Sequence, residues 1–443
     1  MRVVHITAGA GGRLCGSCLH DNTLVRALRA RGCDALLVPA YVPTTTDEES
    51  VAERRVVMGG VNVWLQEHVP LFRRTPAFID RVLDARPVVE WLSGRTGAVT
   101  PAALGPLTVS TLRGETGRQR KEVEKLAAWL AGRLRPDVVH LSNALLVGLA
   151  RRIREATGAV VVCTLSGEDV FVDRLPQPHR DESWRLIRER AVDVDRFVAL
   201  NRFFGDFMAD RLGLRSERVA VIPHGVDLAA FPDAAPDLAF RRRSRDGRLS
   251  VGYLARGCRD KGLDQLVRAL TLIPRRHHVE LVAAGATAGA ERGYVASCLG
   301  LASEFGVADR FRWLGQVDRS AKLGLLGSID VFSMPTVHPE AKGLPVIEAL
   351  AAGVPVVAPR HGTFPELLDD ERAGLLHAPA DPADLAARLT ELLDDGRRAA
   401  RLGAHGHALA RARHSADTMA AAHVRLYGEA LEDRGGRPPV ASG

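Results

Sequence analysis

Residues 334–363 read MPTVHPEAKGLPVIEALAAGVPVVAPRHGT, and this stretch decides the fold. The apolar run DVFSM at 330–334 leads into it and predicts a short buried strand. Residues 344–352 predict a helix that stops at Gly353. The β-branched run VPVVA at 354–358 predicts the next buried strand. This strand–loop–helix–strand order is typical of a parallel α/β sheet, in which ligands bind beyond the carboxyl ends of the strands.

Two glutamates lie at this predicted ligand edge, Glu340 in the loop and Glu348 about one turn into the helix. Free N–H groups at the helix start, next to Gly343, favour an anionic or polar ligand. Carboxylates repel phosphate, so hydroxyl groups of a sugar and a ribose are their better partners. Taken alone, Glu340 is better explained as a surface loop residue and Glu348 as a first-turn acid that complements the helix dipole. The pair within this frame favours a ligand site.

The run PEAKGLPVIEALAAGVPVVAPRHGTFPELL at 339–368 resembles the Glu-x7-Glu signature of retaining glycosyltransferases of the GT-B fold, family 4 (glycosyl transferases group 1). The resemblance spans nearly the whole chain. It implies that Glu340 contacts the donor sugar and that Glu348 contacts the ribose of the nucleotide. It also implies that the donor is held by the backbone of Lys342, Gly343 and Leu344.

Two basic residues, Arg256 and Lys261, bracket the loop that follows the predicted strand LSVGYL at 249–254. An arginine offers a forked phosphate clamp and a lysine a mobile point charge. As isolated surface charges they would carry no meaning. Their spacing resembles the Arg-x4-Lys diphosphate site of the family, which implies that they neutralise the departing diphosphate in place of a metal.

A glycine-rich turn, AGAGGR at 8–13, follows the first predicted strand at 2–7. It is not the dinucleotide fingerprint, because Leu14 occupies the third glycine position. A helix-capping turn that binds nothing is the alternative interpretation. In the family this loop faces the donor diphosphate and the acceptor, so Gly11 and Gly12 are candidate binding residues.

A chain of 443 residues is too long for one ordinary core, and the resemblance implies two Rossmann-like α/β domains facing a cleft. The last helix is expected to cross back to the first domain. The expected parts are an acceptor-side domain at 1–228 with an atypical excursion at 44–130, a linker at 229–248, a nucleotide-sugar domain at 249–415, a helix at 416–432 and a disordered tail at 433–443.

Composition sets the broad class of the protein. The hydrophobic content of 46% fits a globular chain. The sequence has no apolar run of about 18 residues and does not begin like a signal peptide, so a cytoplasmic protein is expected. The net charge of +7 suits an anionic ligand only weakly, because the basic residues are spread out and are mostly Arg, and no nucleic-acid partner is expected. The mixed apolar and basic excursion leaves an acceptor site and a peripheral membrane contact open, with simple packing favoured.

Two further motifs have structural explanations. Cys15 and Cys18 form a lone Cys-x-x-Cys without additional ligands spaced for zinc, so structural thiols are expected and a redox or metal role is the alternative. Asp193 and Asp195 form an Asp-x-Asp pattern that we interpret as a helix end rather than a metal site.

Many family members carry a histidine at about the position of Ser166, where it helps to orient the donor sugar. Serine cannot take that role in the same way. Glu168 and Asp169 are polar enough to take over the role of this histidine.

The resemblance implies transfer of a hexose or aminohexose from a nucleoside diphosphate sugar to an unidentified acceptor, with retention and without a metal or other cofactor. The acceptor is a small molecule, a glycan or a lipid. Two alternatives remain. An epimerase or phosphorylase on the same fold would show itself by product analysis without an acceptor, and a non-catalytic nucleotide-sugar-binding protein would bind the donor without turnover.

Overall fold

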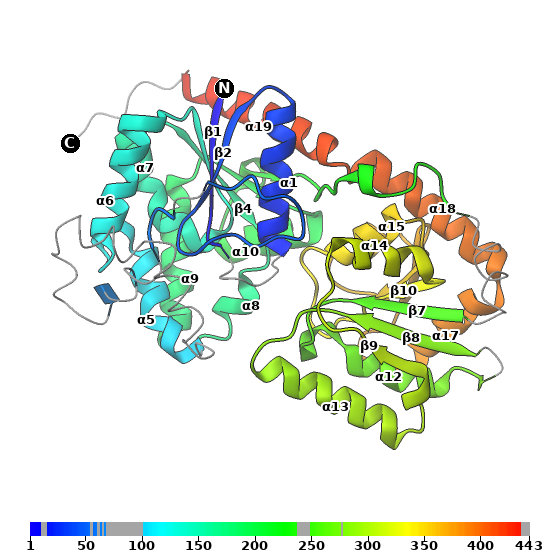
Figure 1. Ribbon diagram of the computed structural model, residues 1–443. Helices are drawn as coiled ribbons and strands as arrows, with labels where there is room; N and C mark the ends of the chain where they lie inside the picture. Colours follow the sequence, from blue (N-terminus) through cyan, green and yellow to red (C-terminus); the bar gives the residue numbers. More distant parts are fainter. Residues whose placement is uncertain are drawn as a thin grey trace. The chain divides into compact units, whose positions relative to one another are not determined.

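The chain folds into two compact units (Figure 1), of which unit 1 comprises Met1–Pro223 with Met419–Gly443 and unit 2 comprises His224–Thr418. Among the described residues, no helix is both long enough and apolar enough to cross a membrane. The computed structural model describes residues 1–9, 16–53, 56–59, 63, 66–67, 101–236, 249–275 and 278–435.

Unit 1 is built on a parallel six-stranded sheet in the order β2-β1-β3-β4-β5-β6. Successive residues of β3 and β4 are buried, as in a sheet covered on both faces. The strands are β1 (Arg2–Thr7), β2 (Asp34–Pro39), β3 (Val138–Leu141), β4 (Val160–Leu165), β5 (Arg196–Ala199) and β6 (Val219–Val221). The helices are α1 (Gly16–Ala30), α5 (Pro101–Leu112), α6 (Arg120–Trp129), α7 (Ala150–Thr157), α8 (Asp169–Val172), α9 (His179–Arg190), α10 (Arg202–Leu212) and most of α19 (Ala416–Gly435).

Unit 2 has a second parallel six-stranded sheet, in the order β12-β11-β10-β7-β8-β9. The strands are β7 (Leu249–Leu254), β8 (Val279–Ala284), β9 (Phe311–Trp313), β10 (Val331–Ser333), β11 (Val356–Pro359) and β12 (Gly374–His377). The helices are α12 (Leu263–Leu272), α13 (Ala290–Glu304), α14 (Arg319–Ser328), α15 (Leu344–Ala351), α16 (Phe364–Leu367), α17 (Pro382–Asp394) and α18 (Gly396–Arg413).

In each parallel sheet, successive strands are added first on one side and then on the other. The change occurs between β1 and β3 in unit 1 and between β10 and β7 in unit 2. Such topological switch points are where Rossmann-like sheets bind ligands. The prediction of two Rossmann-like domains is therefore confirmed. The deciding stretch at 334–363, together with the strand that leads into it, also folds as predicted, with β10, α15 and β11 in sequence.

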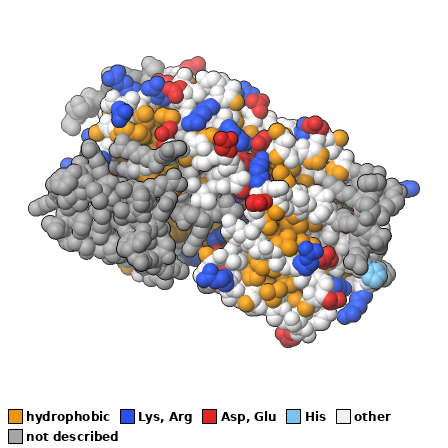
Figure 2. All heavy atoms as spheres, viewed as in Figure 1, with side chains coloured by type: hydrophobic (Ala, Val, Ile, Leu, Met, Phe, Trp, Pro, Cys, Tyr) orange, Lys and Arg blue, Asp and Glu red, His pale blue; other side chains and the backbone are white. Residues whose placement is uncertain are grey.

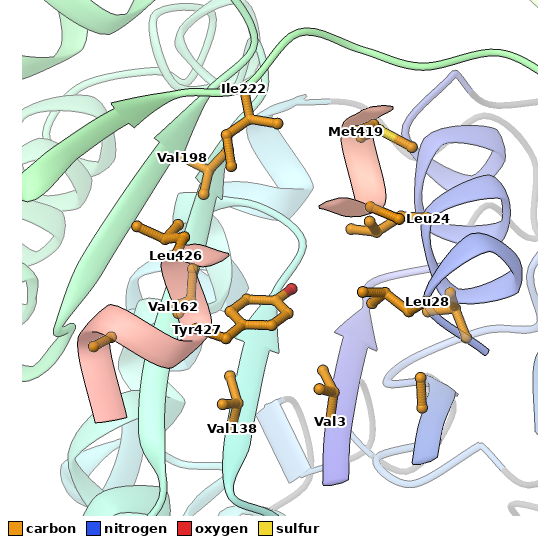
Figure 3. Close-up of a cluster of buried hydrophobic side chains, with 14 of the residues drawn as sticks. Val3, Leu24, Leu28, Val138, Val162, Val198, Ile222, Met419, Leu426 and Tyr427 are labelled. Carbon is orange, nitrogen blue, oxygen red and sulfur yellow. The ribbon is translucent and has the colours of Figure 1, made fainter. Parts of the chain in front are cut away.

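The last helix, α19, returns to unit 1, as the sequence predicted. Figure 3 shows Met419, Leu426 and Tyr427 of this helix among side chains of α1 and the sheet, and all three are buried in that apolar cluster. The helix continues to Gly435, so the predicted start of a disordered tail at 433 is wrong. Asp433 and Arg434 lie in the helix, and residues 436–443 are outside the described residues.

The described part of the predicted linker, residues 229–236, contacts helix α18, and the two units divide at Pro223 rather than at residue 228. The carbonyl of Pro232 accepts a hydrogen bond from His407 Nε2 at 2.9 Å, and Asp233 pairs with Arg411 at 3.0 Å. Proline and aspartate are typical of a linker, but here they supply acceptors that the basic helix α18 binds. Residues 237–248 lie outside the described part of the chain.

The excursion predicted at 44–130 is described only in part, and residues 68–100 lie outside the described ranges. Its helix α5 packs against α9 of the same unit, and α6 packs against α7. Packing, the favoured interpretation, therefore holds for these two helices.

Charged side chains of both signs are interspersed over the described surface in Figure 2. On the described part of that face, the Lys and Arg side chains lie at several places rather than in one basic patch.

Unit 1 also contains a buried polar cluster that the sequence did not predict. It lies between the sheet and helices α1 and α19. His5 Nε2 lies 3.0 Å from Asp21 Oδ1, and His140 Nδ1 lies 2.6 Å from the Tyr427 hydroxyl. The His140 ring also contacts the rings of His5 and His423, with centroids 4.5 Å and 5.5 Å away. All five side chains are essentially inaccessible to solvent.

We expect this cluster to make unit 1 sensitive to acid. Burial is the main cause that lowers the pKa of His423 to about 3 and that of His140 well below its ordinary value. Both histidines are thus neutral in the folded protein, whereas they titrate near 6.5 when unfolded. Stability is therefore fully present above pH 6.5 and is lost as the pH falls towards the folded pKa, by about 2 kcal/mol at pH 5 for His423.

Urea unfolding at pH 8 and pH 5 tests this expectation. The variant His423→Leu should lose less stability on acidification than the wild type. His278→Asn is the matched control, since His278 is exposed in unit 2 and its replacement should leave the difference unchanged. An equal acid loss in His423→Leu and the wild type would show that His423 does not titrate on unfolding.

Candidate active site

The candidate site lies at the carboxyl edge of the unit 2 sheet, beside the switch point between β10 and β7. Three segments meet there: residues 255–262 after β7, residues 334–343 after β10, and residues 360–363 after β11. We call them the switch-point loops. Because neighbouring parallel strands end at the same edge, these loops can combine their side chains.

The backbone of Glu340 is held by the loop after β11. The Thr363 N–H donates to the Glu340 carbonyl at 2.9 Å, and His361 Nε2 donates to the Thr336 carbonyl at 2.9 Å. Gly362 has φ +61°, and a Cβ added there would lie 2.5 Å from the Glu340 nitrogen. Glycine is therefore required at this position for the two loops to approach so closely.

The loop after β7 approaches in the same way. Gly262 has φ +69°, and an added Cβ would lie 1.9 Å from the Pro335 carbonyl oxygen. The Val337 N–H donates to the Asp260 carbonyl at 3.0 Å. These contacts fix the neighbouring Lys261 against the loop that carries Glu340.

The Glu340 side chain forms an ion pair with Lys261 and accepts a hydrogen bond from the Lys342 N–H at 3.2 Å. It is 12% exposed. Burial alone would raise the pKa of Glu340, but the Lys261 charge and the two hydrogen bonds outweigh it and lower the pKa to about 2. Glu340 is therefore a carboxylate at every pH near neutrality and cannot serve as a proton donor there.

The second glutamate, Glu348, lies on the buried side of α15. Lys322 Nζ of α14 donates to Glu348 Oε1 at 2.6 Å, and the two side chains are only 9% and 7% exposed. A buried carboxylate needs such a partner, because an isolated buried charge is very costly. The site thus contains two lysine–glutamate pairs, one between loops and one between helices.

The other predicted residues of unit 2 occupy the same edge. Gly343, with φ +67°, caps α15, and Leu344 is the first residue of that helix. The predicted partner of Lys261, Arg256, follows β7 but points to a different neighbour: it pairs with Glu291 at 3.1 Å and is 55% exposed. Lys261 and Glu340 are therefore joined directly, and Arg256 provides a separate, exposed cation.

Sequence reasoning missed Lys322. A signal was available, since only five of the 60 basic residues are lysines. Three of those five, Lys261, Lys322 and Lys342, belong to this edge. A lysine is a compact charge that one carboxylate oxygen can hold in a tight space, which an arginine fork cannot match.

The predicted residues of unit 1 have mixed outcomes. Gly11, Gly12 and Cys15 lie outside the described residues. Cys18 is a buried free thiol on α1. Ser166 and Glu168 are buried at the carboxyl end of β4, where the Ser166 N–H donates to Glu168 Oε2 at 2.7 Å.

The Asp-x-Asp pattern is structural, as predicted. Asp193 ends the turn after α9 and pairs with Arg151 at 3.1 Å, while Asp195 Oδ2 accepts from the Val161 N–H at 2.8 Å. Within the part of the chain that the structure describes, no group of three or more histidine, cysteine, aspartate or glutamate side chains is placed to hold a metal ion.

Two family models match the chain: glycosyl transferases group 1 over residues 236–408, and glycosyltransferase family 4 over residues 101–230. The D-inositol 3-phosphate glycosyltransferase of Xylanimonas cellulosilytica is 30% identical over 409 residues, which are 86% of this chain and 94% of that protein.

Two solved structures share the fold at low identity. Sucrose-phosphate synthase from Thermosynechococcus elongatus has a TM-score of 0.71 at 20% identity, covering 98% of this chain and all of that one. Anabaena HepE in complex with UDP has a TM-score of 0.68 at 18% identity, covering 97% of this chain and all of that one. Together with the two parallel six-stranded sheets and the Glu340 and Glu348 edge, these matches lead to one conclusion: the chain belongs to glycosyltransferase family 4, the glycosyl transferases group 1, and has the GT-B fold.

Proposed function

We propose that the protein transfers a hexose or aminohexose from a nucleoside diphosphate sugar to an acceptor, with retention of configuration. The observation that carries this proposal is the pair of glutamates at the unit 2 switch point, Glu348 buried and Glu340 only 12% exposed, each joined to a lysine. HepE, which shares the fold, was solved with UDP and also with UDP-glucose, which supports a nucleotide-sugar donor.

In this proposal Glu340 accepts hydrogen bonds from hydroxyl groups of the donor sugar. Its carboxylate lies close to the carbon at which positive charge develops when the glycosidic bond breaks. Lys261 and Arg256 stabilise the negative charge that grows on the leaving diphosphate. The low pKa of Glu340 keeps its charge constant through the reaction.

Glu348 holds the ribose of the nucleotide, and Lys322 fixes its orientation through the 2.6 Å contact. The bond from the anomeric carbon to the phosphate oxygen breaks, and a bond to the acceptor oxygen forms on the same face of the sugar. The departing phosphate oxygen takes the proton of the acceptor hydroxyl. The mechanism therefore needs no protein nucleophile.

A panel of nucleotide sugars tests the proposal, with thermal shift to find the donor that binds. NMR of the product then reports the anomeric configuration after incubation with candidate sugar, glycan and lipid acceptors. Transfer with retention is the expected result. Conversion of the donor without an acceptor would favour an epimerase or phosphorylase, and donor binding without turnover across the acceptor panel would favour a non-catalytic binding protein.

We expect sugar transfer to survive chelation of divalent metals. The reason is that Lys261 and Arg256 already bring two positive charges to the edge where the diphosphate leaves. Turnover should be equal with EDTA and with added Mg²⁺ or Mn²⁺. Loss of turnover in EDTA that Mn²⁺ restores would contradict this prediction and assign charge neutralisation to a metal.

A further inference from the structure

Glu168 joins two loops at the carboxyl edge of unit 1. Its Oε2 accepts from the Ser166 N–H at 2.7 Å, and its Oε1 accepts from the Ala144 N–H at 3.3 Å. Ala144 belongs to the segment after β3, and Ser166 belongs to the segment after β4. One carboxylate therefore fixes the ends of two neighbouring strands, next to the switch point between β1 and β3.

The turn around Glu168 is built for this contact. Gly167 has φ +89°, which lets the chain reverse and bring the carboxylate back to the Ser166 nitrogen. The Ser166 hydroxyl donates to the Ser142 carbonyl at 3.4 Å, a second link between the same loops. Each Glu168 oxygen thus accepts a hydrogen bond from the backbone N–H of a different loop, which ties the side chain to loop geometry.

Because of its buried position, the Glu168 carboxyl group titrates near neutral pH. Burial is the largest cause that raises its pKa to about 7, the Asp169 charge raises the pKa further, and the backbone N–H groups oppose both. Cys163 of β4 lies close enough to feel the Glu168 charge: burial first and that charge second raise the pKa of its thiol, so that it stays neutral. A protonated carboxyl group presents an O–H in place of one acceptor, so one of the two backbone contacts is lost.

We propose that Glu168 is a positioning residue whose carboxylate holds the loops after β3 and β4 in their working arrangement, and that sugar transfer requires its ionised form. The part about transfer rests on the proposed function, whereas the loop geometry does not. Glu340 cannot produce this pH dependence, because it remains ionised.

Hydrogen exchange on the full-length protein tests the loop geometry without any substrate. In the wild type, protection of the Ser166 and Ala144 amides, corrected for intrinsic exchange, should fall roughly tenfold from pH 8 to pH 6, in line with the ionised fraction. Glu168→Gln should abolish this pH dependence, because a carboxamide does not titrate. Asp169→Asn is the matched variant: it removes the neighbouring charge that raises the Glu168 pKa, so the transition should move to lower pH.

The reaction is tested with UDP-glucose as the probe, by following released UDP from pH 5.5 to 9. The wild type should lose kcat/KM below about pH 7. This acidic limb should be absent in Glu168→Gln and displaced to lower pH in Asp169→Asn. The same acidic limb in all three proteins would overturn the proposal. So would amide protection that depends on pH in Glu168→Gln as it does in the wild type. If Glu168→Gln does not fold, Asp169→Asn still decides: a pH midpoint of amide protection equal to that of the wild type would overturn the proposal. Absence of UDP release from every protein would count against the proposed function with this donor, while the exchange experiment still decides the role of Glu168.

Discussion

Replacement of Glu340 by glutamine is expected to lower kcat of sugar transfer by roughly 10²- to 10³-fold, with a modest change in donor KM. The carboxylate is placed at the sugar, where positive charge develops only as the bond breaks. Glutamine keeps the shape and one hydrogen-bond acceptor but removes the charge. It also weakens the hydrogen bonds that hold the sugar against the acceptor, so the reacting carbon is less well positioned. Steady-state kinetics with saturating acceptor measure the effect.

Lys261→Ala separates the two members of this pair. We expect kcat to fall on the order of 10²-fold, because leaving-group charge grows in the transition state. Burial raises the pKa of Glu340, and the charge of Lys261 is the main effect that lowers it. Without Lys261 this pKa therefore rises from its value of about 2. The residual activity should therefore gain a second acidic limb. Lys121→Ala in unit 1 is the lysine control and should keep the wild-type rate; near-wild-type turnover in Lys261→Ala would place the diphosphate elsewhere.

The second large effect concerns the Lys322–Glu348 pair, and it falls on both stability and affinity. Lys322→Ala leaves the Glu348 carboxylate buried without this cation, and breaking such a pair costs about 3–5 kcal/mol. Glu348→Gln should raise donor KM by roughly tenfold or more, since a charged hydrogen bond to the ribose is lost, with a smaller change in kcat. Urea unfolding and steady-state kinetics measure the two quantities.

A double variant, Lys322→Met with Glu348→Gln, tests the assignment of these roles. It removes both charges, so stability should recover relative to Lys322→Ala, while donor affinity should stay low. An exposed pair of unit 2, Arg312 with Glu280, provides the control, and Arg312→Ala should cost less than about 1 kcal/mol. Recovery of donor affinity together with stability would show that the pair only supports the fold.

The sequence predicted those parts of the molecule that depend on local patterns. The strand β10, the helix α15 and the glycine that begins it follow from apolar runs and from glycine and proline positions over some 30 residues. Glu340 and Glu348 were assigned to the ligand edge from the strand–loop–helix–strand pattern, whereas Arg256 and Lys261 were chosen because their spacing resembles that of the family. The structure places Arg256 and Lys261 after β7, Glu340 after β10 and Glu348 in α15.

Contacts between distant segments could not be predicted in the same way. Lys261 and Glu340 are 79 residues apart, and Lys322 and Glu348 are on two different helices. Their pairing depends on strand order and on close loop approaches such as that at Gly262, which no local pattern encodes.

The histidine cluster of unit 1 escaped prediction for a related reason. His5 and His140 each stand alone in an apolar strand, and only the packing of α19 brings His423 to them. In the same way, the composition of the predicted linker does not reveal that α18 binds the carbonyl of Pro232.

Calorimetric titration of free UDP and GDP into the wild type, Glu340→Gln and Glu348→Gln tests the central claim most directly. These nucleotides lack the sugar, so they report only on the nucleotide half of the donor site. For whichever nucleotide the wild type binds, affinity should fall roughly tenfold or more in Glu348→Gln. It should hold or rise in Glu340→Gln, where Lys261 is released to the diphosphate. A loss of affinity in Glu340→Gln together with wild-type affinity in Glu348→Gln would contradict the assignment of the two glutamates.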